Sequence, residues 1–95
     1  MKITFIGAGN MSEAIIAGAL KQEVVAADAV TVGDPLEERR KHMQQAYGIH
    51  TEEDNARAIV DADVVVLAVK PQIFPHVWGS LQSAISPSSL VVSIM

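Results

Sequence analysis

The sequence predicts an α/β domain built on a doubly wound parallel sheet. Short aliphatic runs alternate with segments of helical periodicity five times along the 95 residues, which is typical of parallel strands joined by right-handed helical crossovers. Apolar residues make up 49% of the chain but aromatic residues only 4%, as expected for aliphatic strands that are buried on both faces. A glycine-rich turn, GAGNMS, follows the first aliphatic run.

The first half of the chain is expected to hold two strands, each followed by a helix. Residues 2–6 are β-branched and aromatic and end at a glycine, which is typical of a strand. Residues 10–22 carry apolar side chains at helical spacing, and Asn10 is a suitable N-cap. A second strand is expected at residues 29–34, and the proline that follows it fits the first turn of a polar helix at residues 35–46.

The second half continues the same alternation. After a glycine, residues 49–51 have room only for a short third strand, and residues 53–62 predict a third helix. The run DVVVLAVK, residues 63–70, is the most strand-like in the chain. A fourth helix is expected at residues 74–85 and a fifth strand at residues 89–95. Doubly wound connections place about five strands in the order 3-2-1-4-5.

Composition and charge exclude several function classes. The formal charge is −4 and the chain has no large Lys/Arg cluster, which argues against a surface that follows nucleic-acid phosphates. No apolar segment approaches the roughly 20 residues of a membrane-spanning helix. There is no cysteine, so a disulfide framework and a thiolate metal site are both excluded. A cytoplasmic protein with no membrane or nucleic-acid partner is expected.

The glycine-rich turn matches a dinucleotide-binding motif. Gly7, Gly9 and Ser12 occupy the three positions of G-x-G-x-x-G/A, the signature of Rossmann-type domains, with serine in place of the third small residue. The first glycine allows the sharp turn, and the second lets the backbone approach a pyrophosphate. The anion is then expected at the N-terminus of the first helix. A tight turn without a ligand is the alternative interpretation.

Asp34 strengthens the dinucleotide interpretation. It follows Gly9 by 25 residues, at the end of the second strand, where a carboxylate can accept hydrogen bonds from the adenosine ribose. Such a carboxylate favours NAD, whereas Arg39 or Arg40 in the next helix can favour NADP by binding its 2′-phosphate. The two arginines can equally be solvated partners of the glutamates that precede them. The choice of cofactor therefore stays open.

A second cluster of candidate residues follows the fourth strand. The loop LAVKPQ, residues 67–72, ends a strand that lies beside the first strand in the predicted order, and ligands of doubly wound sheets bind at this point. Asn55 lies on the same rim. Alternatively, Lys70 caps the sheet and Pro71 only ends the strand. We find no paired nucleophile and base and no metal-ligand spacing, so no catalytic residue and no metal site are expected in this chain.

Beyond these motifs, the chain resembles a known family. ITFIGAGNMSEAIIAGAL, the DP after the second strand, DNARAIVDADVVVLAVKPQ and LVVSIM together look like the amino-terminal domain of pyrroline-5-carboxylate reductase. The resemblance covers residues 1–95 and implies an NADPH- or NADH-dependent reduction of a cyclic imine to L-proline, the last step of proline biosynthesis. It further implies a carboxyl-terminal helical domain, absent from this chain, that forms a homo-oligomer and supplies most of the substrate pocket.

The resemblance also assigns roles to individual residues. Ile6 to Met11 hold the pyrophosphate, Asp34 faces the adenosine ribose, and Asn55 with the loop after the fourth strand lies toward the nicotinamide. Many family members have a neutral or basic residue where this chain has Asp34, which leans the cofactor choice toward NADH. The expected cofactor-binding residues are Ile6, Gly7, Ala8, Gly9, Asn10, Met11, Asp34, Asn55, Ala68, Val69, Lys70 and Pro71.

Two other functions fit the same residues. Another two-domain NAD(P) dehydrogenase, of the 6-phosphogluconate or prephenate type, shares the pattern of the first 70 residues but not the AVKPQ motif. A non-catalytic module that senses dinucleotides is the second alternative. A helical second half encoded after Met95 favours the reductase, and a stop codon favours the sensor.

Overall fold

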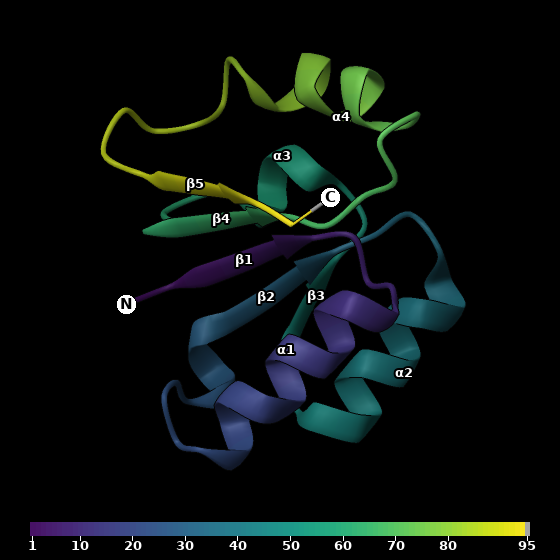
Figure 1. The fold of residues 1–95 in the computed structure, drawn as a ribbon, viewed down its shortest axis with the longest axis vertical. Helices are drawn as coiled ribbons and strands as arrows, with labels where there is room; N and C mark the ends of the chain where they lie inside the picture. Colours follow the sequence, from purple (N-terminus) through teal and green to yellow (C-terminus); the bar gives the residue numbers. More distant parts are fainter. Residues whose placement is uncertain (95) are drawn as a thin grey trace.

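The computed structural model describes residues 1–94 and forms one five-stranded parallel sheet (Figure 1). The strand order is β3-β2-β1-β4-β5, with every neighbouring pair parallel, which confirms the predicted topology. The strands are β1 (Ile3–Ile6), β2 (Val30–Gly33), β3 (His50–Glu52), β4 (Val64–Leu67) and β5 (Leu90–Ser93).

Helices cover both faces of the sheet. Figure 1 shows α1 and α2 on one face and α3 and α4 on the other. The helices are α1 (Asn10–Lys21), α2 (Glu37–Tyr47), α3 (Asn55–Ala58) and α4 (Phe74–Leu81), with a 3₁₀ turn, η1, at Ala27–Ala29. Among residues 1–94, no helix is long and apolar enough to cross a membrane.

The alternation of side chains along the strands produces two hydrophobic cores. In β1, Phe5 belongs to the core under α1 and α2, whereas the next residue, Ile6, belongs to the core under α3 and α4. In β4, Val66 and Val65 divide in the same way, as the two-residue period of a strand requires. The central strands are therefore aliphatic throughout because both of their faces are buried.

Several element boundaries differ from the prediction, each for a local reason. The N-cap of α1 is Gly9, so Asn10 is the first helical residue and the prediction that it caps the helix was wrong. The second helix begins at Glu37, two residues after the proline that was expected to open it. The third helix is much shorter than residues 53–62, because Asp54 caps its start and the chain turns soon afterwards, with a positive φ of 60° at Asp61.

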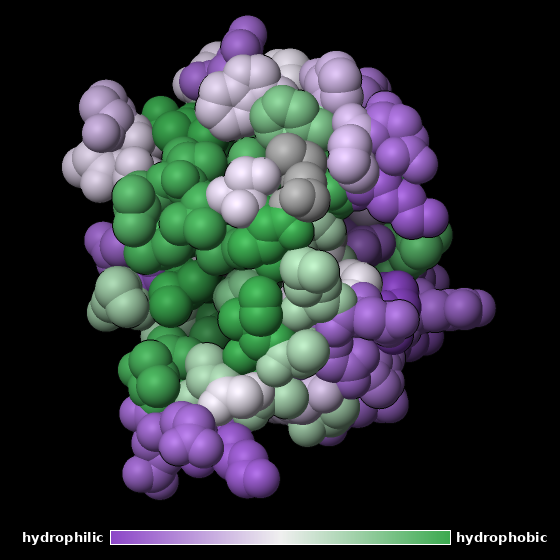
Figure 2. Space-filling model, in the orientation of Figure 1, coloured by the Kyte–Doolittle hydropathy of each residue, from purple (hydrophilic) through white to green (hydrophobic). Residues whose placement is uncertain are grey.

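The last strand lies at an edge of the sheet and is largely uncovered. Each residue of β5 is exposed, and Leu90 retains 61% of its accessible surface. Figure 2 shows apolar side chains gathered over β5 and the neighbouring part of the sheet. The strand begins one residue later than the predicted range of 89–95, and Met95 lies outside the described residues.

Candidate functional site

The candidate site lies where the carboxyl ends of three neighbouring strands meet. Ile6 at the end of β1 pairs with Gly33 at the end of β2 and with Leu67 at the end of β4. The loops that follow these strands are therefore adjacent, although they are far apart in the sequence. A cavity of about 480 Å³ opens between them.

The structure brings all of the predicted binding residues to this edge. Nine of them line the large cavity, and the other three line an adjoining cavity of about 300 Å³ that shares Gly9 and the loop after β4. The residues in the large cavity are Ile6, Gly7, Ala8, Gly9, Asp34, Asn55, Ala68, Val69 and Lys70, and those in the second are Asn10, Met11 and Pro71.

Gly7 is required by the turn itself. Its φ is +106°, and a Cβ atom there would lie 2.7 Å from the carbonyl oxygen of Ala68. The Gly7 N–H donates to the Gly33 carbonyl at 2.8 Å, and the Ala68 N–H donates to the Ile6 carbonyl at 2.9 Å. These bonds hold the turn against both neighbouring strand ends, so the absence of a side chain at Gly7 is explained by the protein alone.

Gly9 has a different environment. A Cβ atom on Gly9 would meet no atom within 4 Å, and its φ of −80° suits any residue. Gly9 caps α1, so the N–H groups of Asn10 and Met11 lie in the first turn, where helical N–H groups have no intrahelical acceptor. Open space beside these donors and the positive end of the helix dipole suits an anion such as a pyrophosphate.

The serine in the third motif position has a structural role. Ser12 is fully buried, and its hydroxyl donates a hydrogen bond to the Gly7 carbonyl at 2.6 Å. This bond joins the first turn of α1 to the start of the glycine-rich loop. The buried hydroxyl is therefore satisfied within the turn, and serine is accommodated where the motif has glycine or alanine.

Asp34 connects the ends of β1 and β2. One carboxylate oxygen, Oδ2, accepts from the Ala8 N–H and the other, Oδ1, accepts from the Leu36 N–H, both at 2.8 Å. Each oxygen keeps a lone pair that a hydroxyl group can use. Because the Ala8 N–H already donates to Asp34, it is not available to a phosphate. The N–H groups of Asn10 and Met11, at the start of α1, are the donors that suit a phosphate.

Asn55 supplies an unpaired polar atom in the cavity wall. Its Oδ1 is buried and has no hydrogen-bond partner among the described residues. A Cβ atom on Gly33 would lie 2.7 Å from this oxygen, so the amide reaches its position because residue 33 has no side chain. Both residues line the large cavity. A buried acceptor without a donor is costly, and a hydroxyl or N–H of a ligand would satisfy it.

The loop after β4 combines structural and open groups. The Lys70 side chain is exposed, whereas its carbonyl oxygen accepts from the N–H groups of Ile73 and Phe74 at 2.9 and 3.2 Å as the chain enters α4. Ala68 and Val69 are partly buried and line both cavities. The backbone of this loop is thus fixed between β1 and α4, while the exposed Lys70 lines both cavities.

Sequence reasoning missed one wall of the large cavity. The turn before α4 and the helix itself contribute Ile73, His76, Val77 and Ser80. These positions recur every three or four residues, which is the signal that could have identified one helical face. That this face turns toward the glycine-rich loop depends on how α4 crosses the sheet. The remaining lining residues that were not predicted are Gly33, Pro35, Leu36 and Glu53.

A polar cluster joins α1 to α2 beside the site. The Glu13 carboxylate accepts hydrogen bonds from the Tyr47 hydroxyl at 2.6 Å and from Arg39 at 3.0 Å, and its Oε2 lies 2.8 Å from Nε2 of His42. The bonds from Tyr47, His42 and Arg39 lower the pKa of Glu13 to about 2, and the bond to Glu13 raises the pKa of Tyr47. We call these four residues the Glu13 cluster.

Arg39 and Arg40 do not pair with the glutamates that precede them, as the alternative interpretation of the sequence expected. Arg39 donates to Glu13 and, through Nε, to the Ala8 carbonyl at 2.6 Å, and Arg40 donates to the Asp34 carbonyl at 2.9 Å. The ion pair with Glu37 is instead made by Lys41. Both arginines therefore bind backbone of the candidate site.

Comparison with known proteins places the chain in a family. Residues 2–95 match the family described as NADP oxidoreductase, coenzyme F420-dependent. The chain belongs to this family. Among curated relatives, the pyrroline-5-carboxylate reductase of Pseudomonas aeruginosa is 45% identical over 93 residues, which cover 98% of this chain and 34% of that protein.

Two solved structures have a similar fold. A pyrroline-5-carboxylate reductase from Coxiella burnetii superposes with a TM-score of 0.90 at 34% identity, over 97% of this chain and 34% of that one. The pyrroline carboxylate reductase of Plasmodium falciparum, solved with NADP bound, has a TM-score of 0.82 at 23% identity, over 99% of this chain and 33% of that one. The chain thus spans about a third of the length of these relatives.

Proposed function

We propose that this chain is the cofactor-binding part of a reductase that uses NADPH or NADH to reduce 1-pyrroline-5-carboxylate to L-proline. The observation that carries the proposal is the large cavity at the carboxyl ends of β1, β2 and β4, which nine of the twelve predicted binding residues line. The chain that forms it is 45% identical to a pyrroline-5-carboxylate reductase. Its sheet order and glycine-rich turn fit a dinucleotide.

The residues of the cavity suit the parts of a dinucleotide. The free N–H groups at the start of α1 would hold the pyrophosphate, and the open space beside Gly9 admits it. Asp34 would accept from the adenosine ribose, and Asn55 and the loop from Ala68 to Pro71 would lie toward the nicotinamide. A bound NAD(P)H supplies the hydride, so the task of these side chains is to hold and orient it.

The groups that bind the imine and donate its proton are proposed to lie outside this chain. Among the described residues, no group of three His, Cys, Asp or Glu side chains could bind a metal ion. A helical second domain, which also forms the homo-oligomer, would provide the substrate contacts. We expect a cytoplasmic protein without nucleic-acid or membrane partners.

The cofactor preference is proposed to lie toward NADH. The carboxylate of Asp34 stands where the adenosine ribose is expected, and a negative charge there repels a 2′-phosphate. The nearest basic side chains, Arg39 and Arg40, are both engaged with protein groups. The family name and the NADP in the Plasmodium falciparum relative make NADPH the competing expectation.

Fluorescence titration with NADH and NADPH tests this assignment. We expect both dinucleotides to bind, NADH more tightly, and Asp34→Ser to improve NADPH binding by about tenfold, because roughly 1.4 kcal/mol of repulsion is removed. Asp28→Ser, which removes a carboxylate from the 3₁₀ turn η1 before β2, is the matched control. Failure of both dinucleotides to bind would refute the proposed function, and equal effects of the two substitutions would refute the role of Asp34.

A further inference from the structure

We propose that Glu13 is a positioning residue that determines cofactor selectivity: it holds the Arg39 guanidinium on the glycine-rich loop and thereby withholds it from a 2′-phosphate. This inference rests on the proposed dinucleotide function. Removing the Glu13 carboxylate should therefore free Arg39 and raise the affinity for NADPH relative to NADH.

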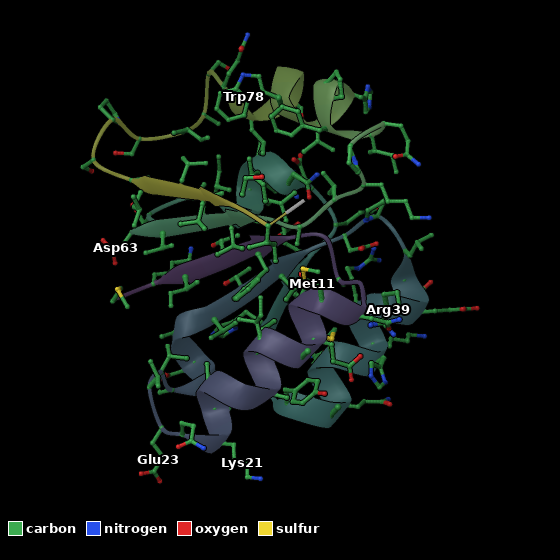
Figure 3. All side chains as sticks on the ribbon, viewed as in Figure 1. Met11, Lys21, Glu23, Arg39, Asp63 and Trp78 are labelled. Carbon is green, nitrogen blue, oxygen red and sulfur yellow. The ribbon has the colours of Figure 1, made fainter. Side chains whose placement is uncertain are left out.

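The position of Arg39 suits it to this role. Arg39 Nε binds the Ala8 carbonyl at 2.6 Å, and the N–H of the same residue, Ala8, binds the Asp34 carboxylate at 2.8 Å. One alanine thus separates the guanidinium from the carboxylate that would bind the ribose. Figure 3 shows Arg39 beside the N-terminal ends of α1 and α2, on the same edge as Met11.

Glu13 has the charge and the rigidity to hold this arginine. Its Oε1 accepts from Arg39 at 3.0 Å, and the side chains of Arg39 and Glu13 are only 30% and 24% exposed. The other carboxylate oxygen is fixed by Tyr47 and His42. Because Tyr47 and His42, two further partners on α2, hold the Glu13 carboxylate in place, moving Arg39 toward a ligand requires breaking a charge-assisted hydrogen bond.

The contact with the Ala8 carbonyl adds a second effect on the loop. In a trans peptide the C=O and the following N–H point in opposite directions, so directing the Ala8 carbonyl toward Arg39 directs the Gly9 N–H away from it. Without the Glu13 carboxylate, Arg39 can still contact the Ala8 carbonyl, but its positive charge is no longer neutralised. The freed guanidinium then presents its remaining donors to an incoming phosphate, which it can bind in a bidentate manner.

The test compares the ratio of NADH and NADPH dissociation constants in wild type, Glu13→Ala and Glu37→Ala. Glu37→Ala is the matched control, because it removes one carboxylate from the first turn of α2 that is paired with Lys41 rather than with Arg39. We expect Glu13→Ala to bind NADPH about tenfold more tightly, the contribution of roughly one charge-assisted hydrogen bond. NADH affinity and the Glu37→Ala ratio should change less than about twofold.

Four further results decide between the inference and its alternatives. The Glu13→Ala/Arg39→Ala double variant should lose the gain in NADPH affinity, and if it keeps the gain, Arg39 is not the group that Glu13 withholds. If Glu13→Ala does not fold, Glu13→Gln replaces it, because glutamine preserves the shape of the side chain. Glu13→Gln should shift the ratio of dissociation constants in the same direction. A purely structural role would weaken both dinucleotides equally and overturn the inference, whereas wild-type protein that binds neither overturns the proposed function itself.

Discussion

Gly7 and Gly9 lie in the same turn but differ in the space available for a side chain. Gly7 has a φ of +106° and lies against the Ala68 carbonyl, so a side chain there collides with backbone. Gly9 has an ordinary φ and open space where its side chain would be. The first glycine is therefore required for folding, and the second has no requirement that the described residues impose.

This contrast gives a prediction for Gly9→Val. We expect the variant to fold with nearly the wild-type Tm, because the added side chain meets no protein atom, and to lose dinucleotide binding, because the side chain fills the space of the pyrophosphate. Circular dichroism and NADH titration measure the two effects. Gly18→Val, also with open space but at the far end of α1, should retain binding.

The companion substitution separates folding from binding. Gly7→Ala should lower the free energy of unfolding by about 2 kcal/mol or more, because it combines an unfavourable φ with a 2.7 Å contact to backbone. Unchanged NADH affinity in a folded Gly9→Val protein would contradict the assignment of the glycine-rich turn. The open space at Gly9 would then be an ordinary feature of an exposed helix start.

Side chains of two elements are coupled through the Glu13 cluster, which makes the α1–α2 contact sensitive to acid. Hydrogen bonds from Tyr47, His42 and Arg39 lower the pKa of Glu13 from 4.5 to about 2. A carboxyl group whose pKa is lower in the folded state than in the unfolded state stabilises the fold above the unfolded value. That stabilisation is lost progressively as the pH falls from about 4.5 to about 2.

We therefore expect wild type to lose more thermal stability over this interval than Glu13→Gln, which has no carboxyl group to titrate. Thermal denaturation at about pH 5 and about pH 2, followed by circular dichroism, measures the difference. Glu37→Gln removes a carboxylate of an exposed pair with Lys41 and should behave as wild type does. Parallel losses in wild type and Glu13→Gln would mean that the cluster does not contribute to stability.

Most of the elements could be predicted because their signals are local. The strand β4 is a run of aliphatic residues, and α1 repeats its apolar residues at helical spacing. The end of the third helix was not predictable in the same way, because it depends on a backbone turn with positive φ at Asp61. The N-cap of α1 was misplaced by one residue, since Gly9 caps the helix through its backbone and not through a side chain.

The candidate site also has parts that the sequence could predict and parts that it could not. Its glycine-rich loop and Asp34 follow strand ends, and parallel strands bring such ends to one edge, so their proximity was predictable. The Glu13 cluster was not, because its partners lie 26, 29 and 34 residues away on another helix. His42, an exposed residue of α2, is one of these partners. Such contacts depend on how two helices pack, which no local pattern specifies.

The whole molecule combines a cofactor cavity with a sheet that is open at one edge. The strand β5 is exposed along its length, and an uncovered strand can pair with another chain or with further polypeptide. The chain also spans about a third of its relatives. Both observations are compatible with the proposed division of labour, in which this chain would bind the cofactor and a further domain would bind the imine.

The division of labour predicts that binding and turnover separate in the 95-residue chain. We expect it to bind NADH or NADPH but to form no measurable proline from 1-pyrroline-5-carboxylate, because hydride transfer requires both reactants to be held face to face. Dinucleotide oxidation can be followed by absorbance, with proline measured directly in the same samples. Proline formation at a rate near that of a full-length relative would contradict the prediction and would require the imine site to lie within the residues of this chain. In that case the α4 wall of the large cavity, with His76 and Ser80, is where substitutions should be made first.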